Sequence, residues 1–80
     1  MKNCVSINLK TDKIVIKIAE NAEQKEIIQV LRKKLPELKK MYQDEKTPIN
    51  VVGKVLKNKE IDEIQELIKK NIDVTVDFDM

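Results

Sequence analysis

The sequence predicts an α+β two-layer sandwich, in which a four-stranded mixed sheet carries two helices packed on one face. Three observations lead to this fold class: two alternating apolar segments open the chain, two segments with helical spacing follow, and a β-branched segment comes after each of them. The order ββαβαβ with short connections favours a hairpin and then two right-handed crossovers. Such crossovers bring both helices to the same face of the sheet.

The first two strands are predicted from alternation. Apolar and polar residues alternate from Val5 to Leu9, and the alternation resumes from Ile14 to Ile18 after the polar pair Thr11 and Asp12. Side chains of a strand point alternately to its two faces, so this pattern indicates one covered face and one largely solvated face. Val15 alone breaks the pattern.

The first helix is predicted to begin at a capping box formed by Asn21 and Gln24. Pro36 lacks a backbone donor and clashes with the carbonyl of the preceding turn, so we expect the helix to end or kink near Leu35, with a further turn through Met41 left open. The apolar residues at helical spacing are Ile27, Ile28, Leu31, Leu35 and Leu38.

The second half of the chain predicts strand, helix and strand. A β-branched run from Ile49 to Val52 ends at Gly53, and Asn58 is a good N-cap for a helix that Asn71 would end in a left-handed conformation. The stripe of that helix consists of Ile61, Ile64, Leu67 and Ile68. Alternation from Ile72 to Phe78 then predicts the fourth strand.

Length and charge limit the range of functions. Eighty residues are enough for one domain, residues 1–80, and a net charge of +2 from 16 basic and 14 acidic side chains does not indicate a nucleic-acid or membrane partner. The single cysteine and the absence of a signal peptide or long apolar run are typical of a soluble cytoplasmic protein. A monomer is expected from the charged outer face, although a swapped first strand would give a dimer.

The residues needed for most catalysis are missing. Without histidine, and with one cysteine and one glycine, the chain has neither a hydrolytic triad nor a zinc site nor a phosphate-binding glycine loop. The acidic residues Asp73, Asp77 and Asp79 are interpreted as protecting an edge strand, in preference to binding a hard cation. We therefore expect no enzyme activity, no metal and no cofactor.

A basic segment follows the middle of the first helix. Arg32 to Lys34 and then Lys39 and Lys40 are interleaved with Leu38, Met41 and Tyr42. One interpretation is a solvated helix end, where lysines favour the carbonyl-rich terminus. The other is protein recognition, because Met, Tyr and Arg are enriched at interfaces and positive charge attracts an acidic partner.

Several segments together resemble the amino-terminal domain of the MinC family of cell division inhibitors. They are the run from Val5 to Lys10, the strand from Ile14 to Ile18, the capped helix through Leu35, and the segment from Gly53 to Leu56 followed by Glu60 to Ile68. The resemblance covers nearly all 80 residues. It implies a domain that binds the tubulin-like GTPase FtsZ, weakens its filaments and so contributes to septum site selection.

The resemblance also implies contact residues and a missing neighbour. Lys10 matches a lysine at the end of the family's first strand, Lys34 matches a lysine of the first helix, and Leu38, Met41 and Tyr42 match contact positions there and just beyond. The family's β-helical domain, which binds the membrane-associated ATPase MinD, has no counterpart in these residues, so a truncated or naturally short form is expected.

Two other functions remain open. An anti-sigma-factor antagonist has a similar small α/β fold, but it needs a phosphorylatable serine before a helix, and the only serine here, Ser6, lies in the predicted first strand. A small RNA-binding domain would need aromatic side chains for base stacking, and only Tyr42 and Phe78 are present.

Overall fold

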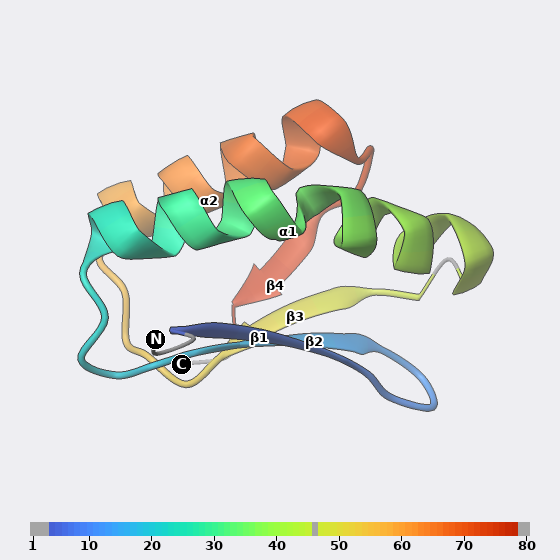
Figure 1. The fold of residues 1–80 in the computed structure, drawn as a ribbon, viewed down its shortest axis with the longest axis horizontal. Helices are drawn as coiled ribbons and strands as arrows, with labels where there is room; N and C mark the ends of the chain where they lie inside the picture. Colours follow the sequence, from blue (N-terminus) through green and yellow to red (C-terminus); the bar gives the residue numbers. More distant parts are fainter. Residues whose placement is uncertain (1–3, 46, 79–80) are drawn as a thin grey trace.

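Four strands form one sheet in the order of the sequence, and both helices cover the same face of it (Figure 1). The predicted fold class is therefore confirmed. The computed structural model describes residues 4–45 and 47–78. The elements are β1 (Val5–Leu9), β2 (Ile14–Ile18), α1 (Gln24–Glu45), β3 (Ile49–Val52), α2 (Asn58–Asn71) and β4 (Val76–Phe78).

The sheet is mixed because only its first connection is a hairpin. β1 pairs antiparallel with β2, with Ile7 opposite Ile16, and the backbone N–H of Lys10 donates to the carbonyl of Lys13 across the turn (2.7 Å). β3 pairs parallel with β2 and β4 pairs parallel with β3. Each parallel pair needs a long connection, and α1 and α2 supply them.

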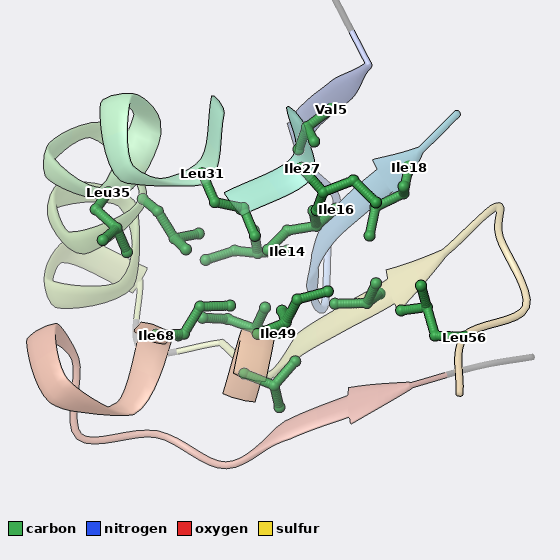
Figure 2. Close-up of a cluster of buried hydrophobic side chains, with 14 of the residues drawn as sticks. Val5, Ile14, Ile16, Ile18, Ile27, Leu31, Leu35, Ile49, Leu56 and Ile68 are labelled. Carbon is green, nitrogen blue, oxygen red and sulfur yellow. The ribbon is translucent and has the colours of Figure 1, made fainter. Parts of the chain in front are cut away.

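The core lies between the sheet and the helix layer (Figure 2). α1 packs over β1 and β2, whereas α2 contacts β4 and the neighbouring α1. The alternation of each strand points its apolar side chains at the helices, as the sequence pattern predicts. The fully buried side chains with the largest volumes are Ile14, Ile16, Ile18, Ile27, Leu31, Leu38, Ile49, Ile64, Ile68, Val5 and Val51.

α1 does not end at Pro36. The helix continues without interruption to Glu45. The prediction that it ends near Leu35 is therefore wrong. A proline inside a helix costs about 3 kcal/mol, but Leu38 after it is fully buried, and burying one leucine side chain returns about 1.5–3 kcal/mol. Met41 and Tyr42 add partly buried apolar surface in the same segment, which explains why the helix tolerates Pro36.

The residues that cap α1 differ from those predicted. Glu23, not Asn21, precedes the helix, and its N–H donates to the Oε1 of Glu26 (3.4 Å). The side chain of Gln24 does not fold back to cap α1. It donates instead to the carboxylate of Glu63 in α2 (2.8 Å) and to the carbonyl of Glu60 (3.3 Å).

Both ends of α2 also differ from the prediction. The N-cap is Lys57, whose backbone N–H donates to the Oε1 of Glu60 (2.9 Å), and Asn58 is the first helical residue. Asn71 is the last helical residue and donates from its side chain to the carbonyl of Leu67 (2.9 Å). The chain leaves the helix at Ile72 in an extended conformation, so the left-handed end predicted at Asn71 is not formed.

β4 is shorter than the alternation suggested. It begins at Val76, although Ile72 is buried like a strand residue. The N–H of Val74 donates to the carbonyl of Ile72 (2.8 Å), a tight local turn that takes this segment away from a ladder with β3. Alternating burial therefore extends beyond the hydrogen-bonded strand.

Candidate partner-binding surface

The end of β1 and the second half of α1 lie at the same end of the molecule. Figure 1 shows the β1–β2 hairpin turn beneath the carboxyl half of α1. Lys10 follows β1 directly and is exposed, and its neighbour Leu9 keeps 46% of its surface exposed. Leu9 and Val55 are the exposed large apolar residues among the described part of the chain.

Lys34 and Met41 share one flank of α1. They are seven residues apart, which is close to two helical turns, and both are half-buried. The opposite flank carries Arg32 and Leu35, which line a hollow of about 360 Å³ together with Asn71 of α2. Since that flank faces α2, the flank of Lys34 and Met41 faces the free edge of β1.

These placements define a mixed basic and apolar surface, called here the β1–α1 surface. It consists of Ile7 and Leu9 from β1, Lys10 at its end, and Lys34 and Met41 from α1. Three of these residues, Lys10, Lys34 and Met41, were predicted as partner contacts from the sequence. Ile7 and Leu9 were not, because their part in the surface depends on β1 being the outer strand of the sheet.

The remaining two predicted contacts lie elsewhere. Leu38 is fully buried beneath α1, so its side chain belongs to the core and is not part of the surface. Tyr42 is half-buried and packs against the core one helical turn after Leu38. The sequence placed both near Met41 in the chain, but a helix separates neighbouring residues onto different faces.

The charge of the surface is positive. β1 contains no charged residue and is followed by Lys10. Between residues 30 and 42, α1 has five basic residues and one acidic residue, Glu37, and two of the five, Arg32 and Lys39, line the hollow on the opposite flank. Most of these cations are exposed, while Lys34 is half-buried. An acidic and partly apolar partner would be attracted to such a surface.

A second hollow lies on the open face of the sheet. It has a volume of about 400 Å³ and includes Asn50, whose Oδ1 is buried without a hydrogen-bond partner. An unpaired buried oxygen of this kind destabilises a fold. The hollow is lined by Asp12, Lys13, Pro48, Asn50, Asp77 and Phe78.

At the opposite end of the molecule, hydrogen bonds join the starts of the two helices and the loops that precede them. The ammonium group of Lys54 donates to the carbonyl of Ala22, which ties the β3–α2 loop to the β2–α1 loop. Gln24 links α1 to α2 through Glu60 and Glu63. These contacts are structural, since each joins two elements of the scaffold.

Cys4 and the acidic residues near the end of the chain do not form a common reactive or metal-binding site in the described residues. Cys4 is buried in the core. Asp73 precedes β4, Asp77 lies within it, and Asp79 lies outside the described residues. In residues 4–45 and 47–78, no group of three or more His, Cys, Asp or Glu side chains is arranged to hold a metal ion. Over the same residues, no helix has the length and apolar character needed to cross a membrane.

No family model, no curated protein and no solved structure matches this chain. The resemblance to the amino-terminal domain of MinC therefore depends on the segments quoted from the sequence. The geometry of the β1–α1 surface is an independent observation.

Proposed function

We propose that this chain is a non-catalytic protein-binding module that uses the β1–α1 surface, and that its partner is FtsZ. As a division inhibitor it would antagonise assembly of FtsZ filaments and so contribute to the choice of septum site. The partner's identity is taken from the resemblance to the MinC amino-terminal domain. The binding surface is taken from the structure.

One observation carries the proposal. An exposed apolar side chain, Leu9, ends β1 next to Lys10 at the free edge of the sheet, which the Lys34 flank of α1 faces, and no acidic residue lies within β1. Positive charge beside an exposed apolar side chain attracts an acidic protein and gives it apolar surface to bury. Met41 extends the apolar part along α1.

The mechanism is steric and electrostatic. The lysines attract an acidic element of FtsZ near a filament contact, and burial of Leu9 and Met41 then holds it. An occupied contact competes with the longitudinal interface between FtsZ subunits or strains it. The proposal assigns no contact with MinD, nucleic acid or membrane to these residues, and it places them in the cytoplasm together with FtsZ.

Charge reversal tests the surface. We expect Lys10→Glu and Lys34→Glu each to weaken binding to GDP-bound FtsZ, measured by fluorescence anisotropy of the labelled domain, by about tenfold. Lys69→Glu, an equal charge change at an exposed position of α2, is the control and should bind normally. Unfolding by urea should show that all three variants stay folded. Normal affinity in both β1–α1 variants would refute the assignment of the surface.

The two other functions make different predictions. A switch of the anti-sigma-factor-antagonist type would take up stoichiometric phosphate at Ser6, which intact-mass measurement after incubation with a kinase extract would detect. Ser6 is exposed on the open face of the sheet within β1, not before a helix. An RNA-binding domain would bind oligonucleotides with an affinity that falls steeply with salt.

A further inference from the structure

The outer edge of β1 is free in the described part of the chain. β1 is the first strand of the sheet and pairs only with β2. Its register with β2 is continuous over all five residues, without a bulge. β1 also contains neither proline nor lysine, the residues with which proteins commonly protect an exposed edge. β4, at the other edge, is only three residues long and includes Asp77.

The hydrogen bonds that bracket the hairpin reveal which backbone groups face outward. The N–H of Lys10 donates to the carbonyl of Lys13, and the N–H of Ala19 donates to the carbonyl of Cys4, both at 2.7 Å. Hydrogen-bonded and non-hydrogen-bonded pairs alternate along an antiparallel ladder. Ser6 and Asn8 therefore pair with β2, whereas the N–H and C=O groups of Val5, Ile7 and Leu9 point to the free edge.

The side chains along the same edge become more exposed toward the hairpin. Val5 is fully buried, Ile7 is half-buried and Leu9 is 46% exposed. All three lie on the face of the sheet that α1 covers, and Met41 and Lys34 lie on the flank of α1 above that edge. Unpaired backbone groups and an open apolar strip thus occur side by side.

We propose that an extended acidic segment of a partner protein binds here by adding a fifth strand beside β1. Its apolar residues, at every second position, would pack against Ile7, Leu9 and Met41. Its acidic residues would lie on the other face, where Lys10 follows the strand. The inference rests on the proposed function in giving this surface to a partner, but it does not require that the partner is FtsZ.

Strand addition is recognised mainly through the main chain, with alternate side chains giving specificity. Lys10 on the open face favours an acidic segment over a neutral or basic one, and Lys34 adds positive charge on the α1 side of the edge. A second copy of this chain would bring the same lysines to both sides of the interface, so it is a poorer occupant than an acidic segment.

The test uses a synthetic peptide in which glutamate and valine alternate, acetylated and amidated and long enough to span β1. Two isomers carry N-methyl groups, one on every valine and the other on every glutamate. Because N–H groups of a strand point alternately to its two sides, only one isomer loses the donors that face β1. We expect that isomer to bind at least about tenfold more weakly than the parent, and the other to bind like the parent.

Variants of the domain supply the matched control. Leu9→Pro removes an outward N–H and leaves the bonds of Asn8 and Lys10 to β2 in place, whereas Leu9→Ala keeps that N–H. We expect Leu9→Pro to bind the peptide about fivefold more weakly than Leu9→Ala. Amide exchange measured by NMR should slow at Ile7 and Leu9 when the parent peptide binds.

The outcomes separate this inference from the proposed function. Equal binding by both N-methylated isomers, or unchanged exchange at Ile7 and Leu9 with peptide bound, would overturn strand addition. Failure of the parent peptide to bind would overturn it too, as would sedimentation showing that a second copy of the chain occupies the edge. If one N-methylated isomer lost binding but the domain did not bind FtsZ, strand addition would stand and FtsZ would be rejected as the partner.

Discussion

Replacing Gly53 by alanine should destabilise the fold strongly. Gly53 follows β3 with a φ of +102°, a conformation that residues with a side chain rarely adopt. A Cβ atom built on it would lie 2.4 Å from the carbonyl oxygen of Ile18 and 3.1 Å from its nitrogen. Both are backbone atoms of β2, so neither can move aside without disturbing the sheet.

The expected magnitude follows from these two effects. Positive φ costs a non-glycine residue about 1–2 kcal/mol, and overpacking against backbone costs about 1–3 kcal/mol. Gly53→Ala should therefore lose about 3 kcal/mol of the roughly 4–12 kcal/mol expected for a domain of this length. In urea this corresponds to a midpoint lower by about 2 M, taking an m-value of about 1.5 kcal/mol/M.

The assay is urea unfolding followed by far-ultraviolet circular dichroism. Val55→Ala is the control, because Val55 lies two residues further along the same loop and is 80% exposed. Its stability should stay within about 0.5 kcal/mol of the parent. If Gly53→Ala changed stability by no more than the control, the close approach of the β3–α2 loop to β2 would be refuted.

Three further stability changes can be measured in the same way. Leu38→Ala should cost about 2–5 kcal/mol because Leu38 is fully buried; a change below about 0.5 kcal/mol would place Leu38 on the surface after all. Pro36→Ala should stabilise by about 1–3 kcal/mol by restoring a donor to the carbonyl of Arg32, and a loss of stability would contradict this. Asn50→Val should stabilise by about 1 kcal/mol, since it removes the unpaired Oδ1; clear destabilisation would indicate that Oδ1 has a partner in solution.

The order and type of all six elements could be predicted from the sequence. Alternation from Val5 to Leu9 and from Ile14 to Ile18 indicates strands whatever they pack against, since each strand has one covered face. The stripe of α2 is equally local. These patterns arise because the strands bury one face against the helices and the helices bury one stripe against the sheet.

The boundaries depended on contacts that the sequence does not reveal. Local rules end α1 near Pro36, but burial of Leu38 against the rest of the core extends the helix to Glu45. Asn58 is the better cap by residue type, yet the chain places Lys57 there, with Glu60 bonding its N–H. At Pro36 tertiary packing outweighs a local preference of about 3 kcal/mol, whereas at Lys57 a local hydrogen bond to Glu60 accompanies the cap.

The candidate site was predictable only in part. The basic residues from Arg32 to Lys40 and Lys10 are evident as charges in the sequence, and the carboxyl half of α1 lies at the same end of the molecule as the β1–β2 turn. The part played by Ile7 and Leu9 depends on β1 being an edge strand, which follows from the sheet order. An alternating first strand with neither lysine nor proline inside it was the available signal.

Sedimentation of cognate FtsZ filaments with GTP, with the domain in excess or absent, tests directly whether FtsZ is the partner. We expect the domain to lower the amount of FtsZ in the pellet or to pellet with it, and the Lys34→Glu variant to do so less. An unchanged FtsZ pellet that contains none of the correctly folded domain would contradict the assignment of FtsZ as the partner.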